Sequence, residues 1–188
     1  MPTPDRFRLQ ADHSILLVVD VQERLSAAMD QDGLQRAVKH IGILLESAHA
    51  LSVPVIVTEQ YVKGLGPTVA AVKEKTGNAT FFEKISFSCC GNAGLLAQLR
   101  QSGRTQIVVC GMETHVCVQQ TVLDLLQEGF VVHVVKDAVM SRAPANRDTA
   151  IEAMTLAGAV PTSTESVVFQ WLKVAGTDVF KQMSKLVK

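Results

Sequence analysis

The sequence predicts an α/β fold, a doubly wound three-layer α/β/α sandwich around a mostly parallel, Rossmann-like sheet. Three observations predict it: apolar runs rich in β-branched residues recur along the chain, segments of helical periodicity separate them, and the connections are short. Because helices cover both faces of a parallel sheet, its strands are continuous apolar runs rather than alternating ones. We expect one domain over residues 1–188, with a core from about residue 14 to residue 172.

Five apolar runs are the predicted strands of this sheet. Each combines β-branched residues with a stretch that has few polar interruptions. They are ILLVVDV (15–21), VPVIVTE (53–59), TQIVVCG (105–111), FVVHVVKDAV (130–139) and the weaker SVVFQWL (166–172).

Four segments of helical periodicity alternate with these runs. LQRAVKHIGILLESAHAL (34–51) has apolar residues every three or four positions, which is the spacing of one helix face. The other three, GNAGLLAQLRQSG (91–103), VCVQQTVLDLLQEG (116–129) and NRDTAIEAMTLAG (146–158), end in glycine, which favours a helix C-terminus. Residues 60–88 are expected to be loop around small elements, and the residues from Gly176 to be a docked helix or a tail.

Composition and charge exclude several classes of partner. Lysine plus arginine and aspartate plus glutamate each number 18, so no basic field favours nucleic acid or an anionic membrane. No run approaches the roughly 18 apolar residues of a membrane span, and the stretch MPTPDRFRLQADHS lacks the apolar core of a signal peptide. We therefore expect a cytoplasmic protein with free thiols and a small-molecule substrate.

Three residues with reactive side chains fall near the expected carboxyl edge of the sheet, where ligands bind in open α/β folds. They are Asp20, Lys84 and Cys117. Each alone also has an ordinary structural explanation, as a helix cap or loop carboxylate, an exposed lysine and a buried inert thiol. Together they suit nucleophilic catalysis, because a helix N-terminus and an ammonium lower a thiol pKa while a carboxylate accepts its proton. The spacing permits the three to meet without requiring it.

Four segments resemble the isochorismatase-like cysteine hydrolases, the family that includes nicotinamidases and N-carbamoylsarcosine amidohydrolase. They occur in the expected order between about Ser14 and Leu172, and an ordered set of four is more specific than any one segment. They are VVDVQ (18–22), TEQY (58–61), EKISFSCCG (83–91) and VVCGMETHVCV (108–118).

This resemblance implies a catalytic triad of Asp20, Lys84 and Cys117. It also implies a non-proline cis peptide bond between Met112 and Glu113, with the backbone N–H groups of Glu113 and Cys117 forming an oxyanion hole. In the implied mechanism Asp20 deprotonates Cys117, and the thiolate attacks a small amide or related carbonyl compound. Water then hydrolyses the resulting thioester.

The chain departs from the nicotinamidases at their metal cluster, an Asp-x-His…His arrangement after the second strand. Here that region is TEQYVKGLGPT (58–68), and the next histidine is His115. We therefore expect a site without a metal, and the absence of a G-x-G-x-x-G fingerprint argues against a dinucleotide cofactor. The residues expected by their position to contact substrate are Gln22, Gln60, Tyr61 and Phe87.

Other candidates have simpler interpretations. His115 and Cys117 are two residues apart, and such residues do not face each other on a helix, so a Cys–His pair is not expected here. Cys89 and Cys90 are expected to be packing or redox bystanders, and Cys110 a core residue.

Two alternatives stay open. One is a catalytically vestigial binding or scaffold protein on the same fold. The other is an isochorismatase-type hydrolase that cleaves a vinyl ether through Asp20 without needing the cysteine. The resemblance also implies a homo-oligomer, either a dimer or a tetramer.

Overall fold

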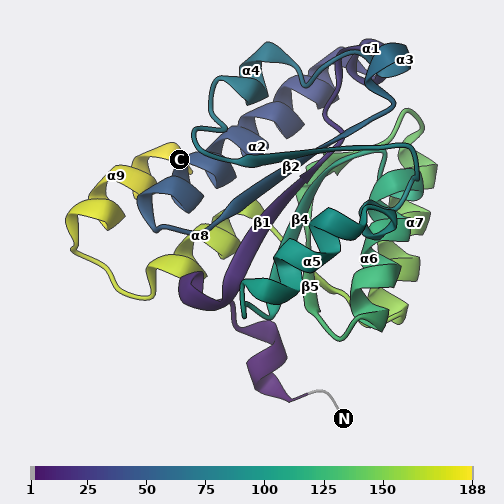
Figure 1. Cartoon of the computed structure of the whole chain (residues 1–188). Coiled ribbons are helices and arrows are strands. Elements are labelled where there is room, and N and C mark those ends of the chain that lie inside the picture. Colours follow the sequence, from purple (N-terminus) through teal and green to yellow (C-terminus); the bar gives the residue numbers. More distant parts are fainter. Residues whose placement is uncertain (1–2, 188) are drawn as a thin grey trace.

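A six-stranded parallel sheet forms the centre of the molecule in the computed structural model, which describes residues 3–187 (Figure 1). The strands are β1 Ser14–Val19, β2 Val55–Gln60, β3 Thr80–Lys84, β4 Gln106–Met112, β5 Val131–Met140 and β6 Val160–Thr162. Their order is β3-β2-β1-β4-β5-β6, and every neighbouring pair is parallel. The predicted α/β fold is confirmed. The predicted domain also includes Met1, Pro2 and Lys188, which lie outside the described residues.

Helices cover both faces of this sheet (Figure 1). Because successive strand residues point to opposite faces, Leu16 and Val18 of β1 pack with α2, α4 and α8, whereas Ile15 and Leu17 pack with α5, α6 and α7. The helices are α1 Glu23–Ala27, α2 Gln31–Ala50, α3 Val62–Leu65, α4 Ala70–Lys73, α5 Ala93–Gln101, α6 Gln119–Gln127, α7 Pro144–Leu156, α8 Thr164–Leu172 and α9 Asp178–Leu186. The result is the expected three-layer sandwich.

Strands β1 and β4 approach unusually closely at their carboxyl ends. Gly111 is paired with Val19 and has a φ of +116°, in the region that favours glycine. A Cβ atom at Gly111 would lie 2.0 Å from the carbonyl oxygen of Val19. Only glycine fits this position. Because Val19 and Gly111 are paired there, Asp20, the residue after β1, lies beside the turn that follows β4.

The predicted strand at 166–172 is wrong, because these residues belong to helix α8. Val167, Val168 and Trp171 are buried at helical spacing, and the Ser163 hydroxyl caps the helix by accepting from the Ser166 N–H. Helical amphipathicity therefore outweighs the β-branched composition. The last strand is instead β6, whose three residues are too few to produce a recognisable apolar run.

Residues 60–88, expected to be loop around small elements, contain α3, α4 and the edge strand β3. Of the two possibilities for the residues from Gly176, the docked helix is confirmed: α9 buries Met183 against Ile43 of α2 and Val168 of α8. Among residues 3–187, no helix combines the length and apolar character needed to cross a membrane.

Candidate active site

Asp20 and Lys84 form a buried ion pair at the carboxyl edge of the sheet. Asp20 follows β1 and Lys84 is the last residue of β3, two strands away in the sheet order. Lys84 Nζ lies 2.6 Å from Asp20 Oδ2, and the two side chains are 1% and 0% exposed. Lysine and aspartate are seldom buried unless paired. The structure therefore brings these two expected site residues together.

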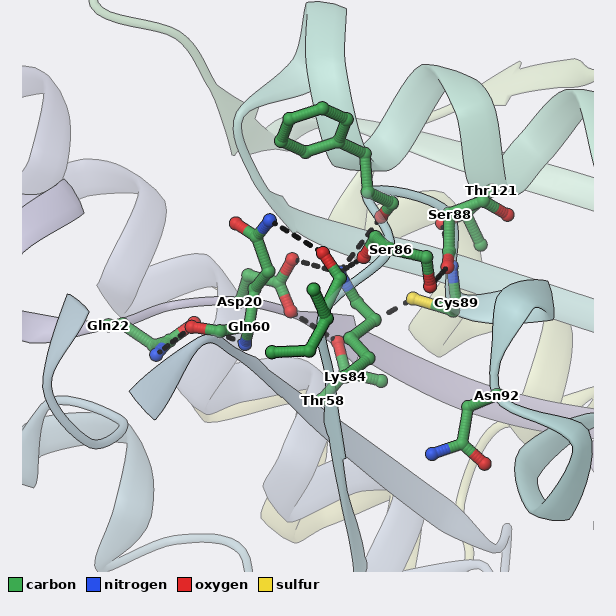
Figure 2. A network of polar contacts seen from close by, with 12 residues as sticks. Asp20, Gln22, Thr58, Gln60, Lys84, Ser86, Ser88, Cys89, Asn92 and Thr121 are labelled. Carbon is green, nitrogen blue, oxygen red and sulfur yellow. Dashed lines mark hydrogen bonds and ion pairs between the residues drawn. The ribbon is translucent and has the colours of Figure 1, made fainter. Parts of the chain in front are cut away.

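Further hydrogen bonds fix both partners of the pair (Figure 2). The Thr58 hydroxyl, from β2, donates to Asp20 Oδ1 at 2.7 Å. Lys84 Nζ also donates to the carbonyl oxygens of Ser86 at 3.1 Å and Phe87 at 2.8 Å. These bonds satisfy the lysine's three donors, so the charged groups are held in one geometry with little freedom.

Cys117 lies beside this pair, in a π-helical turn, Thr114–Val118, that leads into α6. The cysteine is 3% exposed and packs in the cluster between the sheet and α5–α7. Both Asp20 and Lys84 are near enough to affect the ionisation of its thiol. The three expected catalytic residues thus share one buried site.

The ionisation of Cys117 differs from the sequence-based expectation of a lowered pKa. Burial raises the pKa of the Cys117 thiol above its usual value, and the negative charge of Asp20 raises it further. Lys84 acts in the opposite direction but does not overcome these effects. At neutral pH the thiol is therefore protonated, and its activation requires a base that accepts the proton.

The turn between β4 and the π-helix contains a cis peptide bond between Met112 and Glu113. The Glu113 carboxylate accepts from the Arg142 backbone N–H at 3.0 Å and from Arg142 Nε at 3.1 Å. His115 Nδ1 lies 3.0 Å from the Ser141 hydroxyl. Both contacts connect this turn to the segment between β5 and α7, which therefore holds the backbone carrying Glu113 and Cys117.

Gln22 has a structural role in this protein. Its side chain is fully buried; Nε2 donates to the carbonyl oxygens of Gln60 and Gly66, and Oε1 accepts from the Gln60 N–H. Because the amide already makes three hydrogen bonds, it holds the segment after β2 rather than offering free groups to a ligand.

Tyr61 and Phe87 are about half exposed, at 54% and 51%. Tyr61 borders a pocket of about 560 Å³ that is also lined by Lys63, Ile85 and Asn92. Gln60, which precedes Tyr61, donates through Nε2 to the carbonyl oxygen of Ile85 at 3.3 Å. These side chains surround the end of β3 close to the buried ion pair, and their apolar and polar groups can contact a small organic ligand.

Cys89, expected to be a bystander, is in contact with the buried network (Figure 2). Its Sγ lies 3.6 Å from the Thr58 hydroxyl oxygen, and its backbone N–H donates to Thr121 Oγ1 at 2.9 Å. Burial, followed by the charge of Asp20, raises the pKa of Cys89 to about 11. The sequence indicated that Cys89 could lie near the site only through its position in the segment EKISFSCCG, five residues after Lys84.

Glu59, the acidic residue of the TEQYVKGLGPT segment, already has protein partners. Its Oε1 accepts from the Thr68 N–H at 2.7 Å and from the Thr68 hydroxyl at 2.6 Å. Within residues 3–187, no group of three or more histidine, cysteine, aspartate or glutamate side chains is arranged to hold a metal ion. Glu59 thus stabilises the loop after β2.

The protein is a parallel α/β sandwich with a buried carboxylate, ammonium and thiol at the carboxyl edge of its sheet, an arrangement typical of α/β hydrolytic enzymes. Comparisons with known proteins identify the family. The isochorismatase domain model matches residues 14–166. A secreted isochorismatase effector, Isc1, from Phytophthora sojae is 40% identical over 96% of this chain and 87% of its own length. Isochorismatase domain-containing protein 1 from Danio rerio is 38% identical over 93% of this chain, which spans 61% of that longer protein.

Solved structures with the same fold include members and neighbours of this family. The MAR1 ribonuclease from Caenorhabditis elegans has a TM-score of 0.89 and 36% identity, covering 96% of this chain and 92% of that one. YcaC from Pseudomonas aeruginosa, with covalent acrylamide, has a TM-score of 0.87 and 26% identity, covering 99% and 93%. The Escherichia coli YcaC product, an octameric hydrolase of unknown specificity, has a TM-score of 0.87 and 25% identity, covering 99% and 90%. The chain belongs to the isochorismatase-like hydrolase family.

Proposed function

We propose that this protein is a cysteine hydrolase that cleaves a small amide or a related carbonyl compound without a metal or other cofactor. The observation that carries the proposal is the buried ion pair between Asp20 and Lys84 beside the Cys117 thiol. Burying such a pair costs desolvation energy. The Cys117 thiol beside it has a raised pKa, and titratable groups with a perturbed pKa concentrate at functional sites.

The proposed reaction begins when Asp20 accepts the thiol proton and the sulfur of Cys117 bonds to the substrate carbonyl carbon. The backbone N–H groups of Glu113 and Cys117 stabilise the resulting oxyanion. When the C–N bond breaks, Asp20 returns the proton to the departing amine, and a thioester remains. Water, deprotonated by Asp20, then cleaves the thioester, which releases the acid and restores the thiol.

The raised pKa of Cys117 supports a coupled proton transfer, because a thiol that is neutral at rest gains its nucleophilicity only as the base removes the proton. Lys84 stays paired with Asp20 throughout and offsets the negative charge that moves between Asp20 and the substrate oxygen. The hydrogen bond from Thr58 at 2.7 Å orients the same carboxylate.

Turnover of a panel of small primary amides and ureido compounds tests this proposal, with intact-protein mass spectrometry of samples quenched during turnover. Hydrolysis is expected with the native protein, together with an acyl adduct on Cys117. Cys117→Ala should retain the fold and lose both. Cys90→Ser should retain both, because within residues 3–187 the Cys90 side chain makes no hydrogen bond to the ion pair or its partners and only its backbone N–H donates, to Ser88. Full hydrolysis by Cys117→Ala would refute the proposal, and absence of any turnover or adduct would favour the vestigial binding or scaffold alternative.

A second candidate is isochorismatase-type cleavage of a vinyl ether through Asp20. The observation that favours it is the buried Asp20–Lys84 pair, since Asp20 can transfer a proton to the vinyl ether without a thiol nucleophile. Isochorismate is the discriminating substrate. Cleavage by both the native protein and Cys117→Ala would select this function over amide hydrolysis.

We propose a small-molecule substrate rather than a nucleic acid, supported by 18 basic and 18 acidic residues in the chain. The C. elegans neighbour is described as a ribonuclease. Incubation with single-stranded RNA under the assay conditions is therefore the appropriate control, with no cleavage expected.

We further propose a cytoplasmic homo-oligomer, a dimer or a tetramer. The E. coli neighbour is described as octameric, and Ile85, at the end of edge strand β3, is 77% exposed. Four free cysteines suit a reducing compartment, whereas the Phytophthora relative is described as secreted. Native mass spectrometry measures the assembly, and cell fractionation measures the location.

A further inference from the structure

A second pocket lies between α2 and the end of β5, and its lining residue Arg142 also contacts Glu113 of the proposed catalytic turn. It has a volume of about 310 Å³, within the range that accommodates a small ligand. Arg36 and His40 of α2 line one side, and Lys136 of β5 and Arg142 of the following segment line the other. With Arg147 of α7, five side chains that can carry positive charge therefore line one cavity, although Arg147 is already bonded to Asp148 and to the carbonyl oxygens of Val139 and Lys136.

The acidic groups of the pocket are already bonded to the protein. Asp30 accepts from the Gly33 N–H at 2.7 Å, as the cap of α2. Asp137 Oδ1 accepts from the backbone N–H and the hydroxyl of Thr164, both at 2.9 Å. These hydrogen bonds hold both carboxylates in place without removing their charge, so the two aspartates offset only part of the positive charge of the lining, which includes four arginine and lysine side chains.

The basic groups have unused donors. Among residues 3–187, neither the Arg36 guanidinium nor the Lys136 ammonium has a hydrogen bond or an ion pair with another side chain. Arg142 uses its backbone N–H and Nε for Glu113, which leaves the terminal nitrogens of its guanidinium available. An arginine binds a carboxylate or phosphate best through paired donors of this kind.

His40 adds an unsatisfied buried atom at the same place. Its Nδ1 is removed from solvent and has no hydrogen-bond partner within the described part of the chain; Asp137 Oδ2 lies 3.5 Å away without hydrogen-bond geometry. A buried polar atom without a partner is costly unless a ligand or water completes its bonding.

We propose that this pocket binds a small anion that carries at least two negative charges, either a phosphate group or a dicarboxylate, held by Arg36, Lys136 and the terminal nitrogens of Arg142. The concave shape and the limited volume favour a small molecule over a polymer, and the chain as a whole has no excess of basic residues. None of Asp20, Lys84 and Cys117 lines this pocket, so anion binding can be measured whether or not the protein is a hydrolase.

Thermal unfolding of the full chain with increasing inorganic phosphate, and separately with succinate, tests the proposal at an ionic strength held constant with sodium chloride. Binding to the native state raises the melting temperature in a saturable way and yields an apparent Kd. The double variant R36A/K136A should weaken the apparent Kd by about 10-fold or more, because two charge-assisted contacts are lost. Whichever anion gives the larger saturable shift identifies the ligand class.

Lys39→Ala is the matched control, since Lys39 is an exposed lysine of the same helix that does not line the pocket. It should leave the apparent Kd unchanged, and R36K/K136R, which keeps both positive charges, should weaken the apparent Kd less than R36A/K136A does. Arg36 and Lys136 are exposed, so the double alanine variant is expected to fold, which its melting temperature without added anion checks. Equal weakening by Lys39→Ala, no saturable shift with either anion, or tight binding of single-stranded RNA with no binding of phosphate or succinate would overturn the proposal.

Discussion

Lys84 Nζ lies 2.6 Å from Asp20 Oδ2 although the two residues are 64 positions apart in the chain. The pair is buried at the point where β1 and β3 end, with β2 between them in the sheet. Thr58 of β2 completes the row by donating to the free oxygen of Asp20. Three adjacent parallel strands thus place the Lys84 ammonium, the Thr58 hydroxyl and the Asp20 carboxylate side by side at the carboxyl edge of the sheet. The Cys117 thiol comes from the helical turn after β4.

Removal of one partner of this ion pair should destabilise the protein more than removal of both. Lys84→Met leaves Asp20 as an uncompensated buried charge, and such losses lower the free energy of unfolding by about 3–5 kcal/mol. The double variant D20N/K84M removes both charges and should recover most of that loss. Denaturant unfolding of the three proteins measures the difference, and a double variant less stable than Lys84→Met would contradict this account.

Alkylation of Cys117 should respond in opposite directions to the two charges beside it. Asp20 raises the pKa of the Cys117 thiol and Lys84 lowers it, so Asp20→Asn should increase the thiolate fraction at a given pH whereas Lys84→Met should decrease it. The rate of iodoacetamide labelling across pH 7–10 measures this in a Cys90→Ser background. Asp20→Asn should nevertheless lose amide hydrolysis, because it removes the base; faster labelling combined with retained turnover would separate Asp20 from catalysis.

Gly111→Ala should severely destabilise the sheet at the site. A Cβ atom there would lie 2.0 Å from the Val19 carbonyl oxygen, so β1 and β4 would have to separate. Gly103→Ala is the matched control, since Gly103 also has a positive φ but no atom within 4 Å of the added Cβ. Strain in the left-handed region costs about 1–2 kcal/mol at Gly103, and we expect Gly111→Ala, at a φ of +116° and with the clash added, to cost several kcal/mol more in denaturant unfolding. Equal losses would show that the close approach has no energetic weight.

His133 should make the protein less stable as the pH falls from 6.5 to 4. Its Nε2 donates to the Arg6 carbonyl oxygen, Nδ1 has no partner within the described residues, and burial lowers its pKa from 6.5 to about 4. The unfolded chain therefore binds the proton first, and the stabilisation present above pH 6.5 is lost as the pH decreases towards 4. A shift of this size corresponds to a loss on the order of 3 kcal/mol.

Denaturant unfolding between pH 4 and pH 7 measures this dependence. His133→Leu should reduce the slope of stability against pH in that interval, although it also loses the contact with Arg6. His13→Gln, which replaces an exposed histidine, should leave the slope unchanged. If His133→Leu shows the same slope of unfolding free energy against pH as the native protein, the pH dependence comes from other groups.

The apolar runs and helical periodicity of the sequence predicted most of the fold. Four of the five predicted strands are present, because a strand buried on both faces must be apolar throughout and therefore leaves a clear local pattern. Residues 166–172 were assigned to a strand because their composition is β-branched and aromatic, yet burial along one helical face decided the outcome. Strands β3 and β6 are short or partly exposed at the sheet edges, so neither has a strong apolar pattern.

For the site, the sequence by itself determined which side chains are available and where their strands end, since these are local properties of the chain. Only the tertiary structure decided that Lys84 points inward to Asp20, that Gln22 is committed to backbone partners, that Cys89 contacts the network through Thr58, and that the pKa of Cys117 is raised. Each of these depends on distances between residues far apart in the chain and on the exclusion of water around them. Neither quantity is encoded in any single segment of the sequence.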